Sequence, residues 1–152
     1  MYARLAYYSE ITSEFSAEMM HDIVRKSQMN NACHGVTGCL VQHGKYFIQL
    51  LEGPRSVLTR LFCAIAKDSR HTNVVLVELR DISAARFPGW NMLNISNQFM
   101  PAIQGVLFDP DAFTGSALGH TMEKAARYLE ELRSADPKAA AVDAGLAPSV
   151  HA

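Results

Sequence analysis

The chain has 152 residues, of which 49% are hydrophobic and 19% are charged, and its formal net charge is -1. This length and composition fit one globular domain with some extension. The charge balance argues against a nucleic-acid surface, and no apolar run is long enough for a transmembrane helix. The N-terminus lacks the pattern of a signal peptide. We therefore expect a cytoplasmic protein with no nucleic-acid and no membrane partner.

The cysteines and histidines give no sign of a metal or disulfide site. Cys33, Cys39 and Cys63 are odd in number and show no CxxC spacing, which argues against a disulfide framework and against zinc. The histidines are scattered without a metal-binding spacing. We expect reduced, mostly buried thiols and no metal.

The first part of the chain predicts a strand and then a helix. Residues 2–9 alternate loosely and include tyrosines, as a strand does. Ser16 suits the N-cap of a helix whose apolar residues then recur at helical spacing. This helix should end near Asn30 and Asn31, because asparagine favours caps and turns.

The middle of the chain predicts a hairpin followed by a second helix. Residues 36–42 and 45–51 both have strand patterns, and His43-Gly44 between them suits a tight turn. Pro54 suits the first turn of the helix that follows. One apolar stripe marks that helix, formed by Leu58, Leu61, Phe62 and Ile65.

Two further strands complete the pattern, at residues 73–79 and 90–95. The resulting order βαββαββ predicts an α+β fold with an antiparallel or mixed sheet and both helices on one face, the ferredoxin-like plan. Residues 74–77 are apolar on both faces. The second face of the sheet therefore needs a cover.

The C-terminal part supplies a candidate for that cover. We divide the chain into a domain at 1–97, a helical extension at 98–133 and a disordered tail at 134–152, which is rich in alanine. The extension has an apolar stripe at 4-3-4-3 spacing, which suits docking on the sheet or on another chain. The stripe consists of Leu118, Met122, Ala125, Leu129 and Leu132.

Polar residues in apolar surroundings are the unusual features of this sequence. Tyr7 lies on the first strand, which the βαβ plan makes central. Gln49 lies between Phe47 and Leu51 in an apolar strand, where an unpaired amide costs about 1–3 kcal/mol. Taken singly, Tyr7 fits an ordinary core tyrosine, Gln49 fits an edge or solvent-facing position, and the two asparagines fit helix caps.

Taken together, these residues resemble a known family. Residues 27–54 resemble the core of the BLUF domains, sensors of blue light using FAD. The shared features are the asparagine pair, then Gly-Val-Thr-Gly at 35–38, then Phe-x-Gln-x-Leu-Glu-Gly at 47–53. Residues 4–9, 68–74 and 86–92 resemble further family motifs in the same order. The similarity covers residues 2 to 95, about two thirds of the chain.

The resemblance implies a role for each matching residue. Tyr7 and Gln49 would carry the photochemistry, with Tyr7 as electron donor and Gln49 as the bridge to the flavin. Tyr8, which is adjacent, should point to the other face of the strand. The residues implied to bind the cofactor are Tyr7, Ile23, Asn30, Asn31, Gln49, Arg70 and His71, and those implied to pass the signal on are Trp90 and Met92.

The implied function is that of a short, single-domain blue-light photoreceptor without enzymatic activity. Flavin excitation would drive proton-coupled electron transfer from Tyr7 and a rearrangement of Gln49, by rotation or tautomerisation. The signal would pass through the last strand and the C-terminal helix to a protein partner or to self-association as a homo-oligomer. FAD is the expected cofactor, with FMN or riboflavin as alternatives. The alternative function is a light-insensitive interaction module on the same fold.

Overall fold

A five-stranded sheet with two helices forms the body of the protein. The computed structural model describes residues 1–86, 89, 91–95 and 109–114, together with residues 116, 117, 119, 120, 123, 124, 127, 131, 134 and 135. The elements are β1 (Tyr2–Ile11), α1 (Ala17–His34), β2 (Thr37–His43), β3 (Tyr46–Pro54), α2 (Arg55–Ile65), β4 (His71–Ile82) and β5 (Leu93–Ile95).

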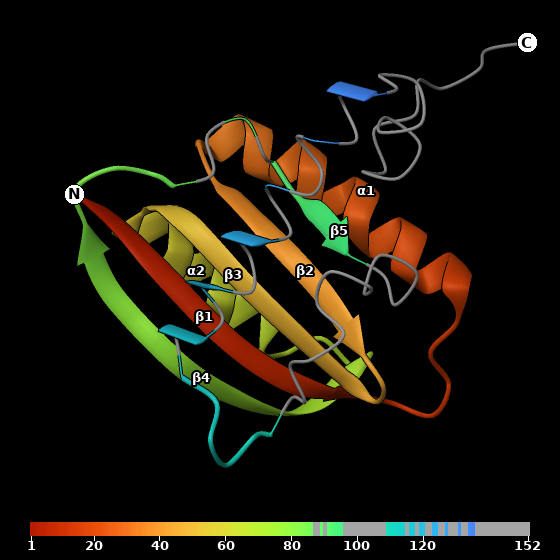
Figure 1. The fold of residues 1–152 in the computed structure, drawn as a ribbon. Helices are drawn as coiled ribbons and strands as arrows, with labels where there is room; N and C mark the ends of the chain where they lie inside the picture. Colours follow the sequence, from red (N-terminus) through yellow and green to blue (C-terminus); the bar gives the residue numbers. More distant parts are fainter. Residues whose placement is uncertain are drawn as a thin grey trace, which may run out of the picture.

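The topology of the sheet is that of the predicted ferredoxin-like plan. The strand order is β4-β1-β3-β2-β5. The first four strands pair antiparallel, and β5 adds to β2 in parallel. Both helices lie on the same side of the sheet (Figure 1). This confirms the predicted order of elements and the position of the helices.

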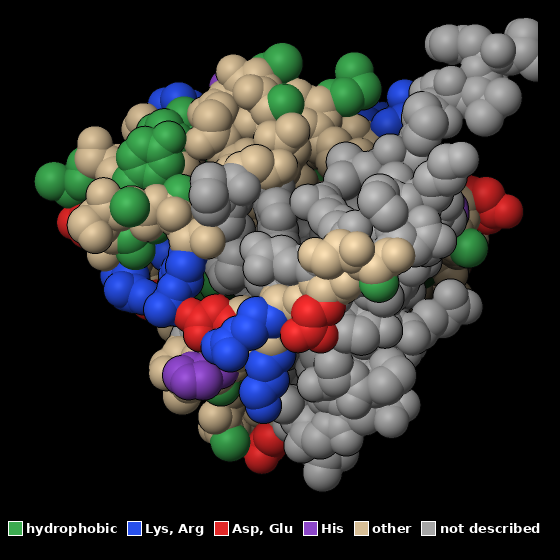
Figure 2. Space-filling view, turned by 45° about the horizontal axis from the view of Figure 1, so that its top comes forward, with side chains coloured by type: hydrophobic (Ala, Val, Ile, Leu, Met, Phe, Trp, Pro, Cys, Tyr) green, Lys and Arg blue, Asp and Glu red, His purple; other side chains and the backbone are tan. Residues whose placement is uncertain are grey.

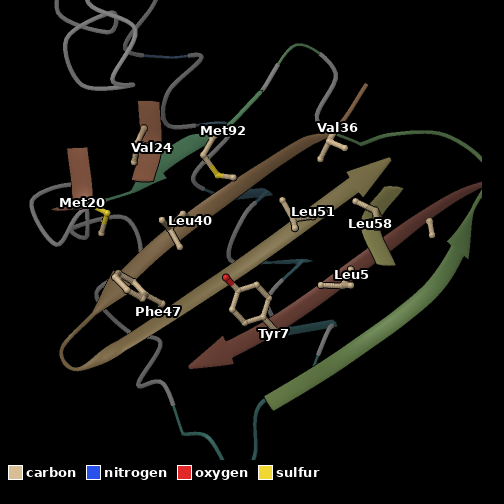
Figure 3. Packing of buried hydrophobic residues seen from close by; sticks show 11 residues of the cluster. Leu5, Tyr7, Met20, Val24, Val36, Leu40, Phe47, Leu51, Leu58 and Met92 are labelled. Atoms are coloured by element: carbon tan, nitrogen blue, oxygen red, sulfur yellow. The ribbon is translucent and has the colours of Figure 1, made fainter. Parts of the chain in front are cut away.

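The register between β1 and β3 decides which side chains face the helices. Tyr7 lies opposite Gln49, and Arg4 lies opposite Glu52. Since neighbouring strand residues point to opposite faces, Tyr7 and Gln49 face the helices whereas Arg4 and Glu52 face away. Figure 3 shows the core on the helical side, built from Ala3, Leu5, Tyr7, Met20, Val24, Val36, Leu40, Phe47, Leu51, Leu58 and Met92.

Helix α1 begins as predicted and ends later than predicted. Ser16 is its N-cap, with the side chain accepting a hydrogen bond from the backbone of Met19 at 3.3 Å. The helix continues past Asn31 to His34 and ends at Gly35, whose left-handed φ of 65° makes it the C-cap. The prediction of an end at Asn30 and Asn31 is wrong because Asn31 is buried, and its side chain bonds to another element rather than capping its own helix.

The other boundaries shift by a few residues. The hairpin turn is Gly44-Lys45 rather than His43-Gly44, because His43 still pairs with Tyr46. Strand β4 is longer than predicted and β5 is shorter, and Trp90 lies outside the described residues. The stripe of the second helix is confirmed, with Leu58 buried and Leu61, Phe62 and Ile65 packed against the core.

The face of the sheet away from the helices is covered at its centre and open at β4. Cys39, Val41 and Leu50 on this face are buried. Described residues of the C-terminal segment lie on this side in Figure 1, and the rings of Tyr8 and Phe113 meet edge to face, 6.3 Å between centroids. Tyr8 therefore points away from Tyr7, as predicted.

The expectation that residues 74–77 are covered is wrong for β4, which is an edge strand. Val75 and Leu76 there remain 40% and 46% exposed. The apolar stripe from Leu118 to Leu132 lies outside the described residues. The described residues from 116 onward have helical backbone.

The surface charges and the cysteines contribute little to identifying a functional site. Cys39 is buried, but Cys33 and Cys63 are exposed, so the expectation of mostly buried thiols is wrong. Basic and acidic side chains intermingle on the face that Figure 2 shows. Within the described part of the chain, no helix is long and apolar enough to cross a membrane, and no group of three histidine, cysteine or acidic residues could hold a metal ion.

Gly38 provides a test of the packing between β2 and β3. A Cβ at this position would lie 2.5 Å from the carbonyl oxygen of Leu50 and 2.9 Å from Leu51 Cδ2. We expect Gly38→Ala to lower the free energy of unfolding in urea by about 1–3 kcal/mol, because the core must shift. Gly44→Asn is the control, since its Cβ meets nothing within 4 Å and asparagine tolerates a left-handed φ. Equal stabilities of the two variants would contradict this packing.

Candidate functional site

Two adjoining cavities lie between α1, α2 and the sheet. Their volumes are about 120 and 220 Å³, and together they reach the range of about 300–1,000 Å³ that is typical of small-molecule sites. They share the lining residues Lys26, Ser27, Gln49 and Ile65. The cleft therefore runs along α1 and crosses the sheet at Gln49.

Tyr7 and Gln49 form the floor of this cleft. Both side chains are buried, at 3% and 4% exposure. The Tyr7 hydroxyl donates a hydrogen bond to Gln49 Oε1 at 2.5 Å, and Figure 3 shows it pointing towards β3. The cross-strand pairing predicts this contact, since directly opposite residues share a face.

The other end of the Gln49 amide points to Met92. Gln49 Nε2 donates to Met92 Sδ at 3.6 Å, and a thioether is only a weak acceptor. An amide NH₂ carries two protons, and the second has no acceptor among the described residues. Gln49 therefore brings an unused donor to the cleft, and it links Tyr7 on β1 to the residue that precedes β5.

Asn31 lies at the second end of the cleft. Its side chain is 1% exposed, and its Nδ2 donates to the backbone oxygen of Asn91 at 2.6 Å. Its Oδ1 has no hydrogen-bond partner within the described residues. Asn30 lines the same cavity from an exposed position, so the structure brings both predicted asparagines to the cleft.

The walls of the cleft are apolar. Ile23 on α1, Leu40 and Phe47 on the sheet, and Ile65 on α2 line it. Sequence reasoning missed Ser27, which lies at the helical spacing that joins Ile23 to Asn31. The sequence pattern places Ser27 at helical spacing with Ile23, but it was not assigned to the site.

Charged residues form the rim of the smaller cavity. Arg70 makes a bidentate contact with Asp68, and its Nη1 lies 3.6 Å from Asp22 Oδ2. Lys26 pairs with the same Asp22 oxygen at 2.8 Å. The hydrogen bond from Arg70 lowers the pKa of Asp68 to about 2, so this carboxylate is ionised at neutral pH. Sequence reasoning identified Arg70 but missed Lys26 and Asp68.

His71 is engaged by the protein at both ring nitrogens. Nδ1 lies 2.7 Å from Ser9 Oγ, and Nε2 lies 2.6 Å from the Ile65 carbonyl oxygen. Because a carbonyl only accepts, Nε2 carries a proton. The ring also meets Tyr7 at its edge, 6.4 Å between centroids. His71 thus ties β4 to the end of α2 and packs against the photochemical candidate.

Tyr7 remains a neutral phenol at physiological pH. Burial, and to a lesser extent the negative charge of Asp68, raise the pKa of Tyr7 well above its usual value of 10.0. The hydroxyl therefore keeps the proton that it donates to Gln49.

A flavin fits the chemistry of this cleft. An isoalloxazine is a flat apolar ring with donors and acceptors along one edge. The cleft offers apolar walls and, as far as the described residues go, an unused donor on Gln49 and an unpaired acceptor on Asn31. Buried groups of this kind cost free energy unless a ligand satisfies them.

Comparison with known proteins points to the same cofactor. The family described as "Sensors of blue-light using FAD", BLUF, matches residues 2–93. A photoactivated adenylate cyclase subunit beta of Euglena longa is 32% identical over 107 residues, which are 68% of this chain and 12% of that protein. The blue light- and temperature-regulated antirepressor BluF of Escherichia coli K12 is 35% identical over 57% of this chain and 21% of its own length.

Solved structures show the same fold. The dark state of BlrB, a BLUF protein, has a TM-score of 0.70 at 31% identity and covers 82% of this chain and 96% of its own. The ground state of BlsA has a TM-score of 0.70 at 27% identity, covering 82% of this chain and 87% of that one. A family match over residues 2–93, together with these structures, shows that the chain belongs to the BLUF family of blue-light sensors.

Proposed function

We propose that this protein is a blue-light photoreceptor that holds FAD in the cleft between α1 and α2. The observation that carries the proposal is the contact series Tyr7–Gln49–Met92, which opens on the cleft and ends at the residue that precedes β5. Tyr7, Ile23, Asn30, Asn31 and Gln49 would hold the ring system. Arg70 and His71 would lie towards the phosphates. FMN and riboflavin share the ring and would enter the same place.

Tyr7 acts as the electron and proton donor in this proposal. When bound, flavin would supply the absorption of blue light and the acceptor for one electron. Tyr7 gives up an electron, and its hydroxyl proton leaves along the hydrogen bond to Gln49 Oε1, 2.5 Å away. Both return afterwards, so that Tyr7 ends as it began. The lasting change is in Gln49.

Gln49 can settle in a second arrangement because its amide has a donor end and an acceptor end. Rotation of the amide would place Nε2 towards Tyr7 and Oε1 towards Met92. A thioether cannot donate a hydrogen bond, so the contact between Gln49 Nε2 and Met92 Sδ would be lost. Tautomerisation is the alternative rearrangement. In either case the contact between Gln49 and Met92 differs between the two forms of Gln49.

A charge network offers the route from the sheet to the C-terminal segment. Glu52 is 0% exposed. One of its carboxylate oxygens pairs with Arg4, and the other accepts the backbone N–H of Arg86 at 2.6 Å. The Arg86 guanidinium pairs in turn with Glu123. A shift of β5 would move the loop that carries Arg86 and loosen its hold on Glu123.

The output would then be a change at the C-terminal segment, which binds a downstream protein or a second copy of the chain. The chain spans only 12% of its Euglena longa relative and 21% of its Escherichia coli relative. We assign no enzymatic step to the described residues, whose function here is to sense light and change conformation.

The role of Tyr7 can be tested against its neighbour. We expect Tyr7→Phe to bind flavin but to lose the reversible red shift of flavin absorption under blue light, because the hydroxyl proton is gone. Tyr8→Phe, whose ring faces the other side of the sheet, should keep the full shift. Absorption spectra in the dark and after illumination measure both. A red shift in Tyr7→Phe would overturn the mechanism.

The two asparagines should differ in their effect on cofactor binding. Asn31 is buried, and its cleft-facing Oδ1 has no hydrogen-bond partner among the residues that the structure describes, whereas Asn30 is exposed. We expect Asn31→Ala to weaken FAD binding by on the order of 1–3 kcal/mol, the cost of losing a buried hydrogen bond, and Asn30→Ala to weaken it less. Titration of the apoprotein with FAD, followed by flavin fluorescence, gives both constants. Equal affinities would contradict the placement of the ring edge at Asn31.

If the signal passes through Arg86, loss of its ion pair with Glu123 should give the C-terminal segment in the dark the behaviour that light gives it in the wild type. Arg86→Gln keeps the backbone N–H to Glu52 and removes the ion pair with Glu123. We expect amide hydrogen exchange at residues 109–135 to rise about two- to fivefold in the dark, the range for one partly exposed ion pair, and blue light to raise it in the wild type. Arg80→Gln, which breaks a pair with Glu78 within β4, is the control. If amide exchange in the dark is the same in Arg86→Gln as in the wild type, this route is ruled out.

A further inference from the structure

We propose that Gln28 is a positioning residue of the light switch and that it acts by holding Met92 in reach of Gln49. Gln28 Nε2 donates a hydrogen bond to the backbone oxygen of Met92 at 3.1 Å. The two residues are 64 positions apart in the sequence. This inference rests on the proposed function, since it concerns the readout of Gln49.

Met92 needs such a hold because the sheet does not supply one. Strand β5 is three residues long, and its pairing with β2 begins at Leu93 opposite Cys39. Met92 precedes that first pair. Within the described residues, its carbonyl oxygen is held by Gln28, and the carbonyl oxygen of Asn91 is held by Asn31. Two amides of α1 thus fix consecutive peptide groups at the start of β5.

The same residue is therefore held at two points from two elements. Gln28 on α1 binds the main chain of Met92, and Gln49 on β3 binds its sulfur. The position of the sulfur follows from the position of the main chain. When Gln49 returns to the dark arrangement, its Nε2 again needs Met92 Sδ as acceptor. When Met92 moves freely, its sulfur is within reach of Gln49 for a smaller fraction of the time. The rate of dark recovery then falls in the same proportion.

The test replaces Gln28 by methionine, which is unbranched, suits a helix and cannot donate a hydrogen bond. We expect dark recovery of flavin absorption to slow by about two- to tenfold, the factor that one net hydrogen bond supports, with the size of the red shift unchanged. Gln28→Glu, of the same shape but without a donor at neutral pH, should slow recovery as well. Gln42→Met is the control, because this half-buried glutamine lies on β2 outside the two cavities.

A double-mutant cycle separates positioning from a general effect on the fold. Met92→Leu conserves volume and removes the sulfur acceptor. If Gln28 acts through that sulfur, Gln28→Met slows recovery in the wild type and adds nothing in the Met92→Leu background. Equal slowing in both backgrounds would show that Gln28 acts on the fold in general, and unchanged recovery in the wild-type background would also overturn the proposal.

Hydrogen exchange in the dark tests the hold itself without photochemistry. We expect Gln28→Met to raise amide exchange at residues 91–95 about two- to tenfold and Gln42→Met to leave it unchanged. Unchanged exchange in Gln28→Met overturns the hold even in a protein with a normal red shift. A wild-type protein that binds flavin without any red shift overturns the proposed function and, with it, the switching role of Gln28. The two failures are thus distinguishable.

Discussion

The register between β1 and β3 is the constraint on which the rest of the structure depends. It places Tyr7 opposite Gln49 on the helical face and Arg4 opposite Glu52 on the other face. A slip by one residue would turn every side chain of β1 to the opposite face. Tyr7 would then leave the cleft, and Arg4 would enter the core without its carboxylate. The candidate site and the charge network are therefore two consequences of one pairing.

The buried Arg4–Glu52 pair protects that register more than it adds stability. Removing two charges from water costs several kcal/mol per ion, roughly offset by their attraction and hydrogen bonds. In the observed register Glu52 also accepts the backbone N–H of Arg86, so both carboxylate oxygens are bonded. Any other register would leave a buried charge unpaired. The pair thus penalises the alternatives to the alignment that joins Tyr7 to Gln49.

Much of this fold was predictable from local sequence patterns. Contacts between residues distant in sequence were not predictable in this way. The order of strands and helices and the apolar face of α2 follow from periodicity, and the Tyr7–Gln49 pair follows from the resemblance. The end of α1 was wrong because tertiary contacts of Asn31 override its preference for caps. Gln28 was missed because an amide that binds a carbonyl 64 residues away has no local pattern. Lys26 and Asp68 make local pairs with Asp22 and Arg70, and only the contact between Arg70 and Asp22 brings these two pairs together at the rim.

In the proposed function, helix α1 is the element that couples the cofactor site to β5. Ile23, Ser27 and Asn31 line the cleft along one face, while Gln28 and Asn31 hold the two carbonyl groups before β5. Asn31 belongs to both sets, because its nitrogen binds the Asn91 carbonyl oxygen before β5 and its oxygen has no hydrogen-bond partner in the described part of the chain. A ligand that donates a hydrogen bond to this oxygen orients the same amide that fixes Asn91. If the cofactor binds as proposed, its binding and the position of β5 share the Asn31 side chain, which meets the physical requirement for coupling between two sites.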